Sequence, residues 1–202
     1  SVNSLRTSGF HVQPNASSFD FSYVKSKKEY EEVLQLRYQA YQSSGKLDPS
    51  IGPEFMKDEF DIRARILIVK IHGRIVGSAR AMFYEANEKT SHENYLTYPS
   101  WFPKSTECLE VSRVCVDPAF RGVGLARELA KHIALLTLKS GRKYCYLSAQ
   151  ETLAQFWMDL GYKDSGVTYL HKWLGGLEHR LLINNIEESI LGRGISPKNW
   201  AN

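Results

Sequence analysis

The chain has 202 residues, of which 43% are hydrophobic and 24% are charged, a size and composition that suit one globular domain with a sizeable core. The net charge of +4 is a mild excess without a block of lysine or arginine, so the sequence does not favour a nucleic-acid-binding protein. A small acidic partner fits this charge better.

Several further classes are excluded by residue patterns. No apolar stretch approaches the roughly 20 residues of a membrane span, and the first residues lack a basic start followed by an apolar run. The cysteines (Cys108, Cys115 and Cys145) are odd in number, which indicates free thiols and a reducing cytoplasm rather than a disulfide framework. Cys115 or Cys145 could carry an acyl thioester, although buried cysteine usually packs as a small hydrophobe. The histidines show no metal-ligand spacing, so we expect no metal.

The first elements in chain order are an arm, a strand and a helix. Residues 1–18 are rich in Ser and Asn and predict a loosely held arm before a single domain spanning 19–202. Residues 19–24 alternate like a strand. Ser26 stands three residues before Glu29, a capping-box pattern that opens a helix ending near Gln42. The residues at spacings of three and four that form its inward stripe are Tyr30, Val33, Leu34, Arg37 and Tyr41. Arg37 therefore either lays its stem over the core or aims a cation into a pocket.

The middle of the chain combines a long loop, a hairpin and an irregular segment. Residues 43–59 are polar and contain Gly and Pro, as functional or mobile loops do. Strands at 65–71 and 74–83 are joined by His72-Gly73, a tight hairpin pattern. Residues 84–107 have no clean period, and we expect their aromatic residues to line an apolar tunnel: Tyr95, Tyr98, Trp101 and Phe102.

The remaining pattern alternates strands and helices. We expect strands at 109–116, 143–149 and 168–173, and helices at 122–140, 152–160 and 181–191. This order mixes hairpins with strand-helix-strand crossovers. It predicts an α/β fold with a mixed sheet and helices on both faces.

A glycine-punctuated turn links the strand ending at Val116 to the helix after Gly124. A helix start leaves backbone N–H groups unpaired and carries about half a positive charge, so it can hold a phosphate without a metal. Gly122 and Gly124 allow the backbone to approach such a ligand closely. The alternative is an ordinary strand-to-helix connection.

The strand before this turn contains two charged residues, Glu110 and Arg113, among apolar neighbours. Charges in such a strand are costly unless they are paired or used. Simple alternation places the two side chains on opposite faces, so they can serve one site only if the strand is bulged or splayed. The alternative to a functional role is a buried ion pair of Glu110 with Arg80 or Arg113.

The turn Arg121-Gly122-Val123-Gly124-Leu125-Ala126, preceded by Val116-Asp117-Pro118, resembles the pyrophosphate loop of the GNAT N-acetyltransferase superfamily. The resemblance implies a GNAT-like domain, with a mixed, mostly antiparallel sheet whose central strands splay apart. It also implies that the donor is an acyl-phosphopantetheine cosubstrate, with no permanently bound cofactor. The residues that it assigns to donor binding are Val114, Val116, Arg121, Gly122, Val123, Gly124, Leu125 and Ala126.

Glu110-Val111-Ser112-Arg113 is similar to a strand signature of acyl-homoserine lactone synthases, the autoinducer makers. More of that pattern stands upstream, in Arg37, Tyr41, Glu59-Phe60-Asp61 and Arg80. Two departures are Ala64, where those synthases have a second Asp three residues after the first, and the missing Trp in residues 43–46. A chain that joins this pattern to a full phosphate loop resembles the long-chain N-acyl amino acid synthases, especially those that make N-acyl tyrosine.

That resemblance implies transfer of a fatty acyl group from acyl carrier protein, or from acyl-CoA, to the α-amine of an amino acid, with tyrosine expected. Glu110 would be the base, Arg113 would assist or orient it, and Arg37 and Arg80 would hold the carboxylate of the acceptor, beside Tyr41 and Asp61. A backbone N–H near Val114 or Val116 would polarise the thioester.

Several points stay open. In the superfamily, a tyrosine often protonates the leaving thiolate. Trp157 occupies that position here, so the residue that donates this proton is unassigned. Five basic residues either dock an acidic carrier or are solvated surface: Arg121, Lys131, Lys139, Arg142 and Lys143. The alternative functions are an autoinducer synthase, an acyl-CoA-dependent acetyltransferase of small amines, and a non-enzymatic thioester sensor.

Overall fold

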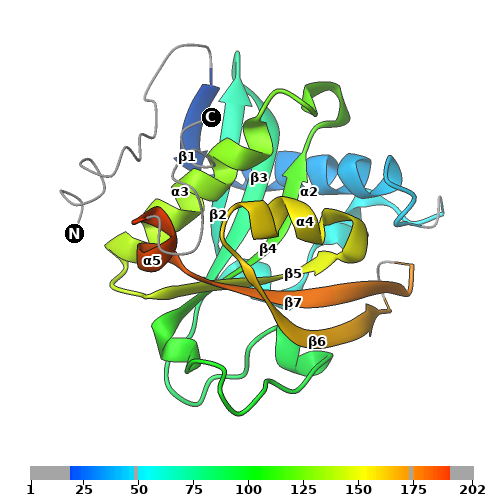
Figure 1. The fold of residues 1–202 in the computed structure, drawn as a ribbon. Coiled ribbons are helices and arrows are strands. Elements are labelled where there is room, and N and C mark those ends of the chain that lie inside the picture. The colour runs from blue at the N-terminus through cyan, green and yellow to red at the C-terminus, as the bar shows by residue number, and fades with distance from the viewer. Residues whose placement is uncertain (1–18, 48–49, 173–174, 192–202) are drawn as a thin grey trace.

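The computed structural model of the chain describes residues 19–47, 50–172 and 175–191 (Figure 1). The predicted arm at 1–18 and the predicted strand end at Trp173 lie outside these residues. The strands are β1 (Phe19–Tyr23), β2 (Arg65–Ile71), β3 (Arg74–Phe83), β4 (Cys108–Val116), β5 (Tyr144–Gln150), β6 (Lys163–His171) and β7 (Leu177–Asn185). The α-helices are α2 (Lys27–Gln42), α3 (Leu125–Lys139), α4 (Glu151–Asp159) and α5 (Ile186–Ile190).

The strands form one sheet in the order β1-β2-β3-β4-β5-β7-β6. Only β4 and β5 run parallel, and every other neighbouring pair is antiparallel. The prediction of a mixed, mostly antiparallel α/β sheet is confirmed. Within the described residues, no helix combines the length and the hydrophobicity that a membrane span requires.

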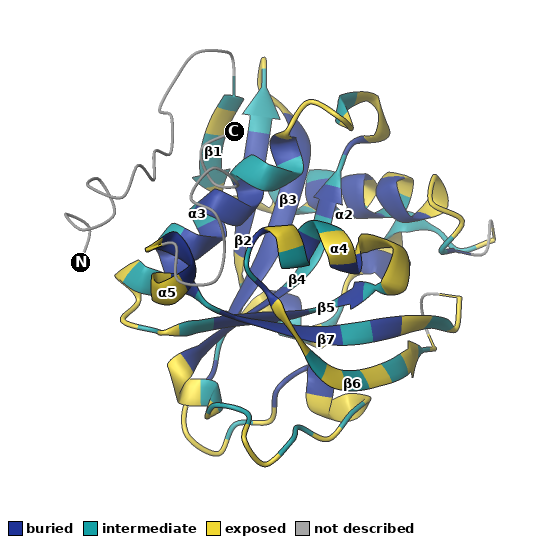
Figure 2. Cartoon of the chain, viewed as in Figure 1, coloured by how far each residue is buried: buried dark blue, intermediate teal, exposed yellow. Residues whose placement is uncertain are grey.

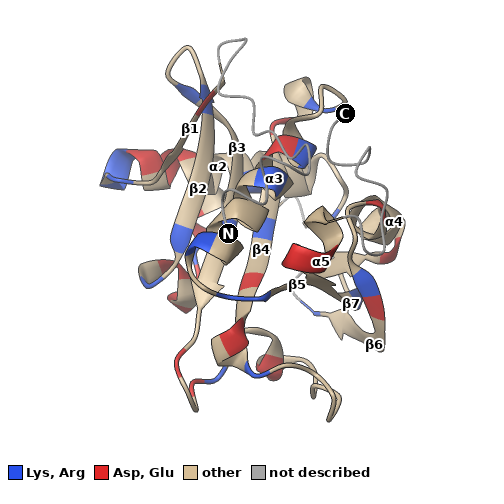
Figure 3. Cartoon of the chain, turned by 60° about the vertical axis from the view of Figure 1, so that its left-hand side comes forward, with Lys and Arg blue, Asp and Glu red and all other residues tan. Residues whose placement is uncertain are grey.

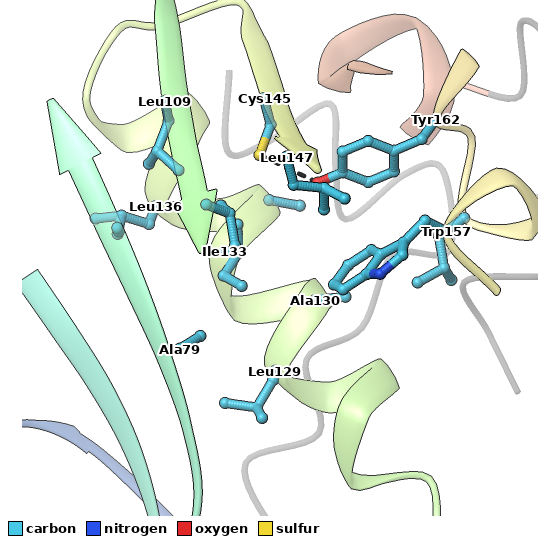
Figure 4. Close-up of a cluster of buried hydrophobic side chains, with 14 of the residues drawn as sticks. Ala79, Leu109, Leu129, Ala130, Ile133, Leu136, Cys145, Leu147, Trp157 and Tyr162 are labelled. Atoms are coloured by element: carbon cyan, nitrogen blue, oxygen red, sulfur yellow. Dashed lines mark hydrogen bonds between the residues drawn. The ribbon is translucent and has the colours of Figure 1, made fainter. Parts of the chain in front are cut away.

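One face of the sheet is covered by α3, α4 and α5, which pack over the central strands (Figures 1 and 2). Leu129 and Ile133 of α3 are completely enclosed, and burying each such side chain stabilises the fold by about 1.5–3 kcal/mol. Figure 4 shows this core, where the Tyr162 hydroxyl donates to Cys145 Sγ at 3.1 Å. All the cysteines are buried free thiols, as predicted.

Two separate segments cover the other face. Helix α2 begins after Ser26, whose side chain accepts from the Glu29 amide at 3.2 Å, and it packs on β2 and β3. The 84–107 segment packs on β4, β5 and β7 through a smaller cluster around Tyr146. This face is therefore divided into two covered halves, with room for a site between them.

The sheet contains one strand more than predicted. The expected helix at 181–191 is wrong, because residues 177–185 form β7, which lies between β5 and β6 and leaves only α5 as helix. Leu181, Leu182 and Ile183 are buried on both faces of the sheet, so they form a continuous apolar run without alternation. Such a run cannot be distinguished from a helix by periodicity alone.

The predicted start of helix α3 at residue 122 is wrong, because the helix begins at Leu125. The backbone just before Leu125 is left-handed. Gly122 and Gly124 both have φ of +82°, and Gly124 caps the helix. Residues without a side chain adopt this conformation at little cost.

Strand β4 contains a bulge that changes the direction of its side chains. Ser78 faces Cys115 whereas Arg80 faces Ser112, so β4 has one residue more than β3 over this interval. Arg113 lies in the bulge with φ of +54°. Its side chain consequently joins Ser112 on the α2 side of the sheet, as the predicted distortion required.

Strands β4 and β5 separate beyond the bulge. They pair only from Cys108 to Val111 on β4 and from Tyr144 to Leu147 on β5. The remainder of β4 is paired with β3 but not with β5, so the centre of the sheet opens as a wedge.

Candidate functional site

A cavity of about 1400 Å³ occupies this wedge. Its wall includes Val116 and Trp157, which belong to the face covered by α3 and α4. It also includes Tyr41 and Met56, which belong to the face covered by α2. The cavity therefore passes through the sheet between β4 and β5 and connects its two faces.

The α3 side of the cavity reaches both ends of the glycine turn, although residues 122–125 themselves are not among the described residues that line it. Val116, Arg121 and Ala126 line it, and a Cβ built on Gly122 or Gly124 would meet nothing within 4 Å. No hydrogen-bond acceptor among the described residues is paired with the amides of residues 122–126. The turn thus presents a row of free N–H groups at a helix start, which suits a phosphate.

Arg121 connects this turn to helix α2. Its guanidinium donates to the Ala40 carbonyl at 3.1 Å and to Ser43 Oγ at 2.8 Å, at the C-terminal end of α2. It is still part of the cavity wall. Part of its hydrogen-bonding capacity therefore fixes the turn against α2.

On the α2 side, the charged residues form an arginine–aspartate cluster, composed of Arg37, Arg80, Arg113, Asp58 and Asp61. Figure 3 shows charged residues of both signs along β4 and around it. Three guanidinium groups face two carboxylates, so the cluster carries one surplus positive charge. Such a surplus suits an anionic group of a ligand.

Some members of the cluster line the cavity, and others are buried behind its wall. Arg37 is completely buried and grips Asp61 in a two-pronged pair, with N···O distances of 2.7 and 3.0 Å. It is not among the described residues that line the cavity, and neither is Asp61. Arg37 therefore holds Asp61 in place behind the cavity wall. Neither of the two alternatives from the sequence included this buried ion pair.

Arg80 and Arg113 are the cationic members of the wall. Arg80 bonds to Asp58 and donates from Nε to Ser112 Oγ at 2.8 Å, while Arg113 reaches Asp58 at 2.9 Å. Burial lowers the pKa of both guanidiniums, and the carboxylate of Asp58 raises it. The net effect is a raised pKa for each of them. Arg113 is the more accessible, with 19% of its side chain exposed against 4% for Arg80.

Asp58 is a cluster residue that the sequence analysis missed. It bridges Arg80 and Arg113, and the two guanidiniums outweigh its burial and lower its pKa to about 2. In the sequence, the second aspartate stands three residues before Asp61, rather than three residues after it, where the chain has Ala64. The chain therefore does contain two aspartates at this spacing.

Glu110 lies on the same face of the sheet as the cluster, in the half that the 84–107 segment covers. Its side chain has no exposed surface, and Tyr84 and Tyr146 each donate to Oε2 at 3.0 Å. Ser91 Oγ donates to Oε1, and His92 Nδ1 lies 3.1 Å from Oε2. Burial alone would raise the pKa of Glu110, but His92 and Ser91 outweigh it and lower the pKa to about 2.

The aromatic residues of the 84–107 segment take different places. Tyr95 lines the cavity and stacks on Tyr169 with ring centroids 5.7 Å apart. Tyr98 and Phe102 instead pack on Tyr146, and Trp101 is 58% exposed. Only Tyr95 of the predicted tunnel residues is part of this cavity wall.

Trp157 lines the cavity and packs edge-on against Tyr162. It has no acidic proton to offer a leaving group. The Tyr162 hydroxyl points to Cys145, within the core.

Comparisons with known proteins agree with this geometry. A family profile described as an acetyltransferase (GNAT) domain matches residues 36–131, which include the arginine–aspartate cluster, Glu110 and the glycine turn. The chain has the GNAT fold. The profile and the fold indicate an acyltransferase. No curated protein sequence matches the chain significantly.

Solved structures with the same fold include several N-acyltransferases. FeeM, an N-acyl amino acid synthase from uncultured soil microbes, is 13% identical, with 85% of this chain and 92% of that chain covered and a TM-score of 0.64. An acyl-CoA N-acyltransferase from Pseudomonas aeruginosa is 20% identical, with coverage of 83% and 99% and a TM-score of 0.62. The structure of yncA from Salmonella typhimurium with its cofactor acetyl-CoA is 14% identical, with coverage of 84% and 95% and a TM-score of 0.58.

Proposed function

We propose that this GNAT-fold protein transfers a long-chain acyl group from a phosphopantetheine thioester to the α-amine of an amino acid. One observation carries the proposal: a single cavity joins the free amides of the glycine turn to the positively charged arginine–aspartate cluster through the sheet. A donor held by its phosphate on one side then meets an anionic acceptor on the other.

The donor side is supported by unpaired backbone. The amides of residues 122–126 are unpaired, a Cβ at Gly122 or Gly124 would meet open space, and these amides would hold the phosphates. The edge of β4 from Ser112 to Val116 has no strand partner on the β5 side, so it would pair with the amides of the extended pantetheine arm. An N–H near Val114 or Val116 would then polarise the thioester carbonyl.

Acyl carrier protein is the donor that we propose, as in the related synthases, and acyl-CoA is the other source of the same arm. Of the basic residues considered for docking, Lys131 is buried and paired with Glu128, and Arg142 bonds to backbone carbonyls of residues 105 and 106. These two are structural.

The acceptor side is supported by charge. The carboxylate of an amino acid would neutralise the surplus charge of the cluster, with Arg113 as the accessible guanidinium and Arg80 beside it. The stacked rings of Tyr95 and Tyr169 form an aromatic wall in the same cavity. This wall favours an aromatic side chain, and we propose tyrosine as the acceptor.

The size of the cavity supports a long acyl chain. At about 1400 Å³ it exceeds the roughly 300–1,000 Å³ of ordinary ligand pockets. Leu47, Ile51, Phe55 and Met56 form an apolar wall beside the end of α2, where we place the tail. An acetyl group would leave this wall uncovered.

The reaction needs one proton removed from the amine and one leaving thiolate. An α-amine and a thiol have ordinary pKa values near 8 and 8.5, so a well-placed base suffices and the thiolate leaves without strong acid help. Glu110 is buried and ionised, and its negative charge would stabilise the positive charge that develops when the proton leaves the amine.

The experiment that tests this function is incubation of the purified protein with acyl carrier proteins and acyl-CoAs of graded chain length and with each amino acid, read by mass spectrometry. We expect an N-acyl amino acid from a long-chain donor, with tyrosine giving the most product. Acetyl transfer to small amines alone would contradict the proposal, and binding of the donor without turnover would indicate a thioester sensor.

One observation supports a second candidate, lactone synthesis from a methionine-derived cosubstrate. Asp58 and Asp61 both engage the cluster, so the chain does have the aspartate pair whose absence counted against an autoinducer synthase. Addition of that cosubstrate to the same assay distinguishes the two, because a lactone product would replace the open-chain amide.

A further inference from the structure

Glu110 cannot touch a substrate as the site is built. Its side chain has no exposed surface and is not among the described residues that line the cavity. The residues that both contact Glu110 and line the cavity are Ser91 and His92. Among the described side chains, these two therefore connect the carboxylate to the cavity.

Of the two, His92 is the stronger base. Its Nδ1 lies 3.1 Å from Glu110 Oε2, a contact at ion-pair distance without the alignment of a hydrogen bond, and this nitrogen has no hydrogen-bond partner among the described residues. A carboxylate at Nδ1 favours the tautomer with its proton on that nitrogen, as in catalytic His–carboxylate pairs. Nε2, at the opposite side of the ring, is then left for the cavity.

We propose that His92 is the catalytic base that takes the proton of the acceptor amine, and that Glu110 is a positioning residue that orients the imidazole and stabilises the positive charge that the imidazole then gains. This inference deepens the proposed function and rests on it. The neutral amine adds to the thioester carbonyl carbon and gives its proton to His92 Nε2. The carbon–sulfur bond then breaks, the thiolate leaves with the electron pair, and Nε2 returns the proton to the thiolate, which yields an amide and a thiol.

The surroundings of His92 restrict its ring. It packs edge-on against Tyr146 with centroids 5.5 Å apart, and only 5% of its side chain is exposed. The titratable or charged groups that face it from the packed elements are Glu110 on β4, Tyr146 on β5, Tyr169 and His171 on β6, and His179 on β7. Glu110 is the only carboxylate among these groups.

The test compares the wild type with His92→Gln, Glu110→Gln and a matched control, His132→Gln. His132 is a partly buried histidine that stacks on Phe21, away from the described cavity wall. We expect His92→Gln to lower kcat/KM for the acceptor by about 10² to 10⁴ while the donor KM stays within about threefold. The control should retain wild-type kinetics.

The pH profile distinguishes the two roles. After correction for ionisation of the amine itself, the limb that reports the base should disappear in His92→Gln. It should persist in Glu110→Gln with kcat/KM lowered at every pH, because the base remains but its orienting partner is lost. Loss of this limb in Glu110→Gln as well would make Glu110 the base itself and would overturn the inference.

A measurement independent of turnover completes the test. Nitrogen NMR of labelled histidine should show His92 as the Nδ1–H tautomer in the wild type, with that preference lost in Glu110→Gln. An Nε2–H tautomer, or an active enzyme whose rate survives His92→Gln, would overturn the inference. If the wild type shows the Nδ1–H tautomer but forms no N-acyl product, the proposed function is wrong. The catalytic role of His92 is then wrong as well.

Discussion

Arg113 owes its place in the site to a backbone conformation that few residues with side chains adopt. Its φ of +54° turns the guanidinium toward Asp58, on the same face as Ser112. Non-glycine residues at positive φ are uncommon, and they persist where surrounding contacts hold them. Here those contacts are the ion pair with Asp58 and the Tyr41 ring, whose centre lies 5.9 Å from the guanidinium.

Substitution of Arg113 tests the assignment of the acceptor carboxylate. We expect Arg113→Gln to raise KM for the amino acid by about 10- to 100-fold, because a hydrogen bond to a charged group contributes about 1.5–3 kcal/mol. The KM for the donor should stay unchanged. Steady-state kinetics with each substrate varied in turn give both values.

Arg180→Gln is the matched control, since Arg180 is also held in ion pairs, with Glu151 and Asp164, but is not part of the described cavity wall. An unchanged acceptor KM in Arg113→Gln would remove this residue from carboxylate binding.

The candidate site was only partly readable at the scale of residues. Glu110, Arg113 and the arginines of the cluster could be named because charged residues in apolar strands and helices are conspicuous. His92 could not, because it lies in a segment without a period and meets Glu110 only through tertiary contact, 18 positions along the chain. Arg37 was identified, but its burial beneath the cavity required the structure.

Among the elements, the turn before α3 allows a test of donor binding by a pair of glycines. Gly124→Ala and Gly141→Ala both place a methyl group at positive φ, at +82° and +75°, and neither Cβ would meet an atom within 4 Å. Both variants should lose about 1–2 kcal/mol of stability. Only Gly124→Ala should also raise the donor KM, since its methyl group occupies the space beside the free amides. Equal donor KM values would contradict a phosphate site at this turn.

The loop before β2 allows a test of the acyl tail. Ile51→Trp adds bulk to the apolar wall of the cavity, so the preferred donor should become shorter. Product chain lengths from a mixture of donors, measured by mass spectrometry, give the shift. Ile62→Trp is the control, because Ile62 is 86% exposed and is not part of the described cavity wall. A shift in neither variant would place the tail elsewhere.

The elements themselves were predictable where local signals decide them. The start of α2 follows from a side-chain cap at Ser26, and the β2–β3 hairpin follows from His72-Gly73, both of which have positive φ. Strand β7 was missed because burial on both faces removes the alternation that identifies a strand. Its identity is decided by β5 and β6, which pair with it.

For the whole molecule, the arginine–aspartate cluster links stability to pH. The guanidiniums of Arg80 and Arg113 outweigh the burial of Asp58 and lower its pKa from 3.8 to about 2. A carboxyl whose pKa is lower in the folded state stabilises the fold above its unfolded pKa. That contribution should be fully present above about pH 4 and should be lost as the pH falls toward 2.

Urea unfolding at a series of pH values checks this expectation. The free energy of unfolding should decline less steeply between pH 4 and 2 in Asp58→Asn than in the wild type, although the variant is less stable at neutral pH. Parallel curves for the two proteins would show that Asp58 does not carry the linkage.

The bulge in β4 also makes the number of residues in that strand significant. Removal of the residue after Arg113 would restore strict alternation against β3 and turn Arg113 to the opposite face, away from Asp58, while Cys115 would keep its pairing with Ser78. The one extra residue of β4 is therefore what places Arg113 in the cluster, and its loss would remove that guanidinium from the site. The 84–107 segment, which enters no strand, is under no such restriction apart from its few anchor points. Relatives that share this chemistry should differ in length there and agree in length along β4.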